Sequence, residues 1–228
     1  MNTQHSVTAS APGKTNLFFA VGPLQDDGFH EVASVYLALD LLEEVTVTPA
    51  ADWSVSVTGN VSAEQIASVP TDESNLVVKA ARRVAELAGV DAQPIAFSIN
   101  KHVPVAGGMG GGSADAAAAL LAVNALWCTG VESKLTDSVS LGADVPFALA
   151  GGIAIGLGRG EALTQIESVQ PIHLVLVTSD EGLSTPAVYK RLDELRAARG
   201  IDPKLAAEAV VPEDLIRALQ TGDHTALA

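Results

Sequence analysis

The strongest constraint on this sequence is the glycine-rich stretch V-P-V-A-G-G-M-G-G-G-S-A-D-A at residues 103–116. An unbroken apolar run, Ala116 to Val123, follows it, and a strand-like segment, Pro94 to Ile99, precedes it. Glycine loses more conformational freedom on folding than any other residue, so such a cluster has a high entropic cost. Close contact between the backbone and a ligand would offset that cost. A strand, a glycine loop and a helix in succession present backbone N–H groups and the positive end of a helix dipole, which together bind phosphate.

The alternative interpretation of the cluster is a tight structural turn with close packing of small residues. Five glycines that end in G-G-G-S at a predicted helix start exceed what a turn requires. We therefore favour a phosphate site. Ser113 and Asp115 fall at the start of the helix, where a hydroxyl or a carboxylate can cap it or hold a metal bound to the phosphate.

The two common phosphate motifs are absent. G-K-T at residues 13–15 resembles the end of a P-loop, but that motif needs glycine five positions before Gly13, where Thr8 stands. The dinucleotide pattern G-x-G-x-x-G also fails, because Ser113 and Glu161 occupy the third glycine position in the two candidate stretches.

Composition excludes several classes of function. The 228 residues carry a formal net charge of −14, which disfavours a nucleic-acid partner and an anionic membrane surface. The single cysteine, Cys128, forbids an intrachain disulfide, and the first residues lack the basic and apolar regions of a signal peptide, so we expect a cytoplasmic protein. The five histidines show no metal-binding spacing, and we predict no metal site formed by protein side chains alone.

Hydrophobic periodicity predicts a mixture of strands and helices without strict alternation, which is typical of an α+β fold. The predicted strands cover residues 16–21, 31–39, 44–48, 53–58, 94–99 and 173–178. The predicted helices cover residues 75–87, 116–127, 185–198 and 212–219, and residues 145–157 form a short helix followed by a strand.

The loop P-V-A-G-G-M-G-G-G-S-A-D-A-A-A resembles the central phosphate loop of the GHMP small-molecule kinases. Three further segments agree in order and spacing with the branch of this superfamily that acts on 4-diphosphocytidyl-2-C-methyl-D-erythritol. They are A-P-G-K-T-N-L-F at residues 11–18, D-D-G-F-H-E-V at 26–32, and L-G-A-D-V-P-F at 141–147 followed by G-L-G-R-G-E. The resemblance extends from about residue 11 to about residue 189.

The resemblance implies a two-domain GHMP kinase fold with the active site between the domains. Residues 1–160 would form a domain like the second domain of ribosomal protein S5, which binds ATP and substrate, and residues 161–228 a ferredoxin-like C-terminal domain. It implies transfer of the γ-phosphoryl group of ATP, with Mg²⁺, to the 2-hydroxyl of the small-molecule substrate. We expect a monomer or a homodimer.

The resemblance also assigns roles at the reacting end of the site. Asp144 would be the general base, and Lys14 beside it would keep it ionised and polarise the reacting groups. Without the resemblance, Asp144 is a helix cap and Lys14 a solvated turn residue. The expected ATP-binding residues are Asn75, Pro104, Val105, Ala106, Gly107, Gly108, Met109, Gly110, Gly111, Gly112, Ser113 and Ala114.

Four residues are expected on the substrate side. Phe29 would stack on the cytosine, although many relatives have tyrosine there, and His30 would read the edge of the base. Asn16, which faces the same way as Lys14 in a strand, would bind the diphosphate or the sugar. Thr185 would lie near the substrate or else cap the following helix, and Asn75 is equally well explained as a helix cap.

The sequence departs from the superfamily in two places. The segment at residues 127–144 is several residues shorter than the resemblance predicts. The third motif of the superfamily, a glycine–serine loop of the type G-S-G-P-T, does not occur in the 228 residues. We therefore expect a partial C-terminal domain. Two other functions stay open: another GHMP kinase, of the homoserine or mevalonate type, and a non-catalytic nucleotide-binding protein.

Overall fold

Two long strands connect the parts of this fold. The computed structural model describes residues 5–177 and 182–223. Strand β1 (Val7–Leu24) pairs with β2 (His30–Pro49), and the sheet order is β3-β4-β2-β5-β6. The residues divide into two compact units, one with the chain up to Lys14 plus Ala38–Gly151, the other with Thr15–Leu37 plus the chain from Gly152 onward. The expected domains, residues 1–160 and 161–228, stay a prediction.

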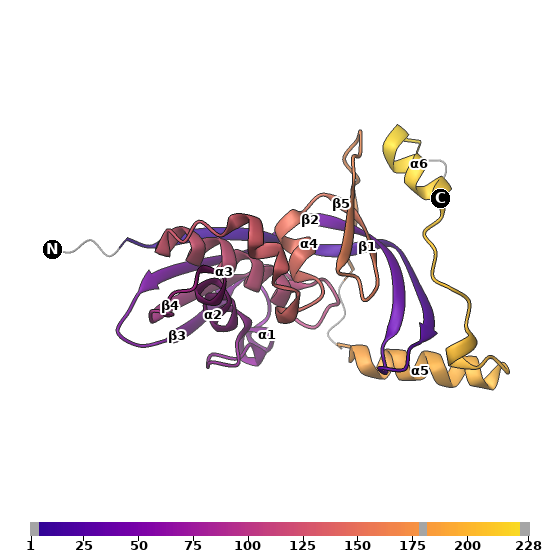
Figure 1. Cartoon of the computed structure of the whole chain (residues 1–228), viewed down its shortest axis with the longest axis horizontal. Helices are drawn as coiled ribbons and strands as arrows, with labels where there is room; N and C mark the ends of the chain where they lie inside the picture. Colours follow the sequence, from indigo (N-terminus) through magenta and orange to yellow (C-terminus); the bar gives the residue numbers. More distant parts are fainter. Residues whose placement is uncertain (1–4, 178–181, 224–228) are drawn as a thin grey trace. The chain divides into compact units, whose positions relative to one another are not determined.

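The first unit combines the second half of β2 with two further strands and several helices (Figure 1). Residues 44–49 of β2 pair antiparallel with β4 (Ile95–Lys101), which pairs parallel with β3 (Ser54–Gly59). The helices are α1 (Ala63–Ser68), α2 (Leu76–Ala88), α3 (Gly111–Trp127) and α4 (Val145–Ala150), with short 3₁₀ turns at Glu132–Asp137 and Val139–Leu141.

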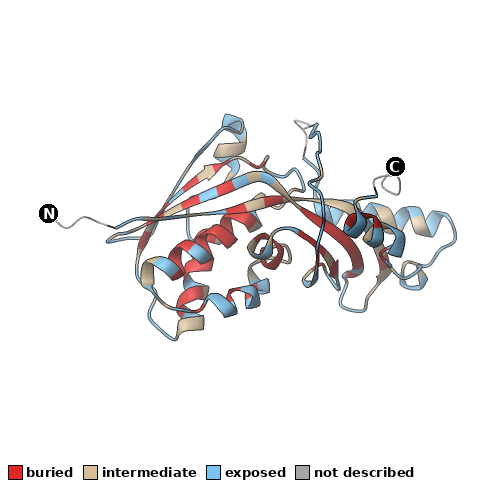
Figure 2. Cartoon of the chain, turned by 90° about the horizontal axis from the view of Figure 1, so that it is seen from above, coloured by how far each residue is buried: buried red, intermediate tan, exposed pale blue. Residues whose placement is uncertain are grey.

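The core of the first unit explains why α3 carries so many alanines. Ala114 and Ala116 to Ala119 are fully buried in one cluster with Val77 and Val84 of α2 and with Phe97 and Ile99 of β4. Small side chains allow α2 and α3 to approach closely, while burial of the larger apolar side chains stabilises the unit. Buried positions, red in Figure 2, accordingly lie along the facing sides of helices and strands.

The second unit contains the first half of β2 and the C-terminal elements. Residues 34–37 of β2 pair antiparallel with β5 (Ile153–Leu157), which pairs with β6 (Ala162–Ile166). Helices α5 (Thr185–Ala198) and α6 (Glu213–Thr221) and a 3₁₀ turn at Pro203–Leu205 complete the unit. Its smaller core includes Val35, Ile153, Ile166 and Leu219.

The α+β class is confirmed, and most predicted elements are present. One predicted strand is wrong. Residues 173–177 have no regular structure, and Val175 and Val177 are 90% and 92% exposed. Thr178, the last residue of that prediction, lies outside the described residues. An apolar run becomes a strand only when a neighbour completes its hydrogen-bond ladder, and no strand in the described part of the chain pairs with this run.

Among the residues that the structure describes, no helix combines the length and apolar character needed to cross a membrane.

Candidate active site

The glycine loop connects the end of β4 to the start of α3, and its last glycines are helical. Helix α3 begins at Gly111, five residues before the predicted start at Ala116. Gly108 and Gly110 have φ values of +72° and +69°, a left-handed conformation that side chains disfavour. Gly110 is the N-cap of α3, and no side chain caps the helix. The first-turn N–H groups of a helix have no partner within it, and such groups can bind an anion.

A cavity of about 390 Å³ lies over this loop. Eleven of the twelve residues predicted to bind ATP line it, namely Asn75, Pro104, Val105, Ala106, Gly107, Gly108, Met109, Gly110, Gly111, Gly112 and Ser113. The twelfth, Ala114, is fully buried in the core through α3 and does not line the cavity. The size of the cavity suits a small-molecule ligand such as a nucleotide.

Lys14 and Asp144 meet beside the loop although 130 residues separate them in the sequence. The Lys14 Nζ lies 3.7 Å from the Asp144 Oδ2, and the Lys14 backbone N–H donates a hydrogen bond to the Met109 carbonyl. A Cβ added at Gly110 would lie 3.2 Å from the Lys14 Cγ and 3.6 Å from the Asp144 Oδ2. The ion pair therefore lies against the glycine loop.

Asp144 occupies the N-cap position of α4, but its side chain makes no capping hydrogen bond. The helix-cap interpretation therefore accounts for the position of this residue and not for its carboxylate. The side chain is 28% exposed, so an approaching hydroxyl group can reach it.

Asn75 caps α2, as one of the two interpretations predicted. Its Oδ1 accepts a hydrogen bond from the Val77 N–H, and its Nδ2 donates to the Pro70 carbonyl. The same residue lines the cavity, so its contact with adenine stays a prediction.

The four expected substrate residues all belong to the second unit. Asn16 donates from Nδ2 to the Ser34 hydroxyl at 2.6 Å. Phe29 is 53% exposed, and the guanidinium of Arg159 lies 3.9 Å over its ring, where it also pairs with Asp27. Thr185 is exposed in the first turn of α5, after Ser184 at the N-cap. Ser184, and not Thr185, therefore holds the capping position.

His30 has partners that sequence reasoning missed. Its Nε2 lies 3.0 Å from the Asp193 Oδ1, and its ring stacks on Tyr189 at 5.2 Å between centroids. Tyr189 and Asp193 follow Thr185 at intervals of four on α5, so helical spacing could have placed the three on one face. No local signal indicates that this face meets His30.

A buried ionic cluster beneath the loop was also missed. The Lys101 Nζ lies 2.7 Å from both the Glu43 Oε1 and the Asp115 Oδ2, and all three residues are buried. The Asp115 Oδ1 has no hydrogen-bond partner among the described residues. Burial, and secondarily the Glu43 carboxylate, raise the pKa of Asp115 from 3.8 to about 7, against the opposing effect of Lys101.

This raised pKa predicts a dependence of stability on pH. The folded state holds the Asp115 proton more tightly than the unfolded chain, so the contribution of Asp115 is full below pH 3.8 and is lost as the pH rises through about 7. Relative to Asp115→Asn, the free energy of unfolding of the wild type should therefore fall between about pH 4 and about pH 7, by up to about 4 kcal/mol. Urea unfolding of both proteins across this range measures the difference. Parallel profiles would contradict the prediction.

The sequence profile of the GHMP kinases N terminal domain matches residues 75–152. A crystal structure of a 4-(cytidine 5'-diphospho)-2C-methyl-D-erythritol kinase aligns with a TM-score of 0.63 and 28% identity, covering 94% of this chain and 72% of the other. L. major mevalonate kinase shares the fold, with a TM-score of 0.70 at 16% identity over 99% of this chain and 72% of its own. The fold is that of the GHMP small-molecule kinases.

Relatives identify the branch of this class. The 4-diphosphocytidyl-2-C-methyl-D-erythritol kinase of Rhodococcus jostii is 48% identical over 97% of this chain and 69% of its own length. The kinase of the same name from Leifsonia xyli is 47% identical over 98% of this chain and 73% of its own. The chain belongs to the family of 4-diphosphocytidyl-2-C-methyl-D-erythritol kinases, as its four sequence motifs predicted.

Proposed function

We propose that this chain transfers the γ-phosphoryl group of ATP to the 2-hydroxyl of 4-diphosphocytidyl-2-C-methyl-D-erythritol. The observation that carries the proposal is the Lys14–Asp144 ion pair against the glycine loop, in a chain 48% identical to a kinase of that name. The kinase class alone would leave the acceptor alcohol open. The acceptor follows from the names of the relatives.

The glycine loop is proposed to bind the ATP phosphates. Phosphate needs several N–H donors at close range, and Gly108 and Gly110 hold the left-handed conformations that expose them. The start of α3 adds a partial positive charge, which stabilises an anion without a permanently charged side chain. These features account for the predicted ATP site in a chain whose net charge is −14.

The proposed chemistry uses the two side chains beside the loop. Asp144 accepts the proton of the substrate hydroxyl as its oxygen forms a bond to the γ-phosphorus, and the bond from that phosphorus to the leaving oxygen of ADP breaks. Lys14 stabilises the ionised form of Asp144 and the negative charge on the moving phosphoryl group. Both side chains act mainly by positioning and by electrostatics, as is typical of phosphoryl transfer.

Mg²⁺ is proposed to arrive with the nucleotide. Among the described residues no three His, Cys, Asp or Glu side chains gather to hold a metal ion by themselves. Mg²⁺ commonly binds through substrate phosphates with one or two protein oxygens, and the Ser113 hydroxyl in the cavity lining offers such an oxygen. When bound, the ion would neutralise charge on the phosphates.

The substrate side is proposed to lie in the second unit. Phe29 offers an exposed aromatic face for the cytosine, and His30, oriented by Asp193 and Tyr189, offers a ring nitrogen or backbone for its edge. Asn16 would bind the diphosphate or sugar, and Thr185 would lie near the substrate. The partners of the protein would be small molecules. We propose that the protein acts in the cytoplasm as a monomer or homodimer.

A panel of acceptor alcohols tests the proposal. The chain is incubated with ATP, Mg²⁺ and either 4-diphosphocytidyl-2-C-methyl-D-erythritol, mevalonate or homoserine, and phosphorylated products are identified by mass spectrometry and ³¹P NMR. We expect transfer only to the first, at its 2-hydroxyl. Transfer only to mevalonate or homoserine would contradict the proposed substrate, and ATP binding without transfer to any of them would contradict catalysis.

A further inference from the structure

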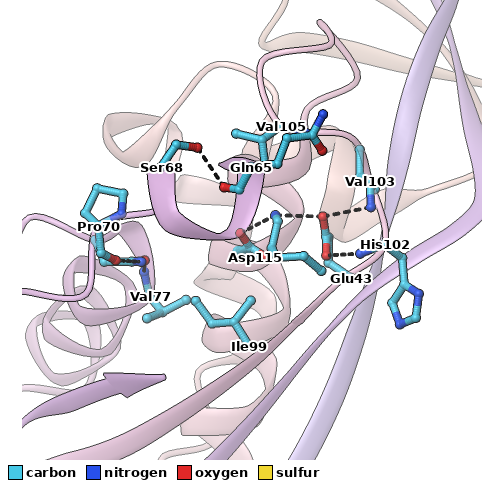
Figure 3. Close-up of polar contacts among 12 residues, drawn as sticks. Glu43, Gln65, Ser68, Pro70, Val77, Ile99, His102, Val103, Val105 and Asp115 are labelled. Carbon is cyan, nitrogen blue, oxygen red and sulfur yellow. Dashed lines mark hydrogen bonds and ion pairs between the residues drawn. The ribbon is translucent and has the colours of Figure 1, made fainter. Parts of the chain in front are cut away.

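Glu43 is the most deeply buried charged residue at the base of the glycine loop, and the proposed chemistry does not use it. Its exposed fraction is 0%, and it projects from β2. Its Oε2 accepts a hydrogen bond of 3.0 Å from the His102 N–H, and its Oε1 accepts one of 3.2 Å from the Val103 N–H. Figure 3 shows the Glu43 carboxylate directed at these two backbone groups. Glu43 therefore binds the first two residues of the loop.

The same carboxylate also lies close to the far end of the loop. A Cβ added at Gly111, the first residue of α3, would lie 3.1 Å from the Glu43 Oε1 and 3.3 Å from the Lys101 Nζ. Lys101, at the end of β4, bonds to Glu43 and to Asp115 in α3 at 2.7 Å each. Glu43 and its two partners thus connect the strand before the loop to the helix after it.

Stability alone does not explain a cluster of this kind. Replacing a buried ion pair by apolar side chains of similar volume is often neutral or stabilising. Each polar contact that Glu43 makes here is instead to Lys101, His102 or Val103, which precede or open the loop. The tip at residues 106–108 is exposed, so these contacts hold the base of a segment whose glycines would otherwise leave it flexible.

We propose that Glu43 is a positioning residue that holds both ends of the glycine loop in the conformation that receives ATP. This inference depends on the proposed function, since it assumes that the loop binds the nucleotide. Glu43 does not line the cavity, whereas Lys101 and Asp115 do. Its effect on ATP must therefore pass through the loop and not through direct contact.

Glu43→Gln tests the proposal most cleanly. Glutamine keeps the shape and one acceptor oxygen, but its amide group faces either the His102 or the Val103 N–H with a donor. Lys101 keeps Asp115 as its ion-pair partner, so no buried ammonium is left alone. We expect the KM for ATP to rise about ten- to a hundredfold, as for a small displacement of a positioning group. The dissociation constant of the cytidine substrate should stay unchanged.

Asn124→Ala is the matched control. Asn124 is a buried polar residue near the C-terminal end of α3, where its side chain forms hydrogen bonds with Glu132, Thr129 and Val131. This variant should lower the Tm and leave the KM for ATP unchanged. If Glu43→Gln also lowers the Tm but leaves the KM for ATP unchanged, Glu43 has only a structural role and the proposal is wrong.

Two further measurements keep the outcome decisive. If Glu43→Gln does not fold, hydrogen exchange of the wild-type chain without nucleotide decides, because the proposal requires slower exchange at His102 and Val103 than at Gly107 and Gly108. Equal exchange would overturn it. Gly110→Ala distinguishes ATP binding by the loop from positioning of the loop by Glu43. If Gly110→Ala leaves ATP binding intact, the proposed loop function is wrong. If Gly110→Ala weakens ATP binding and Glu43→Gln does not, only the positioning role is wrong.

Discussion

Asp144→Asn is expected to lower kcat by about 10²–10⁴-fold, the usual contribution of a general base. Asparagine keeps the shape of the side chain but cannot accept the substrate proton. Because Asp144 makes no capping hydrogen bond in α4, the substitution should leave the fold intact. The ATP affinity, measured by isothermal titration calorimetry, should stay near the wild-type value.

Asp137→Asn is a suitable control for this variant. Asp137 is an exposed carboxylate in the 3₁₀ turn at Glu132–Asp137, and its backbone carbonyl accepts a hydrogen bond from Arg83. It should keep full activity. If Asp144→Asn also kept full activity, the base would have to be another group, and the assignment would be wrong.

Lys14→Met is expected to lower kcat by about 10²–10³-fold, as removal of one transition-state donor does in other enzymes. Methionine retains much of the apolar stem that packs beside Gly110 but removes the ammonium 3.7 Å from Asp144. Loss of this charge weakens stabilisation of the moving phosphoryl group. Single-turnover kinetics under saturating ATP separates this effect on chemistry from an effect on binding.

Lys79→Met, an exposed lysine on α2, controls for the general loss of a positive charge. It should react at the wild-type rate. A Lys14→Met variant with normal single-turnover kinetics and a raised KM for ATP alone would restrict Lys14 to nucleotide binding and remove it from the chemical step.

Local signals in the sequence predicted the local structure well. Asn75 before an apolar helical pattern and Gly89 after it defined α2, and the bounds of α5 agree with the prediction. The glycine cluster correctly indicated a strand–loop–helix arrangement. Its helix starts earlier than expected because the apolar pattern begins at Ala116, whereas glycines carry no periodicity from which a helix start can be read.

Contacts between distant residues were predicted only where a motif marked both partners. Lys14 and Asp144 were paired through family resemblance, since no spacing relates them. Glu43 and Lys101, 58 positions apart, belong to no quoted motif, and their contact depends on the β2–β4 register that pairs Glu44 with Asn100. The strand predicted at residues 173–177 was wrong for a related reason. A strand needs a neighbouring strand, which its own sequence does not specify.

The central claim is that the loop around Gly110 receives the ATP phosphates with Lys14 and Asp144 at the reacting end. A crystal structure with a non-hydrolysable ATP analogue and the cytidine substrate tests it most directly. The account predicts phosphate oxygens within hydrogen-bond distance of the loop N–H groups and the substrate 2-hydroxyl about 2.6–3.2 Å from the Asp144 carboxylate. A nucleotide bound away from the loop, or a hydroxyl beyond the reach of Asp144, would contradict it.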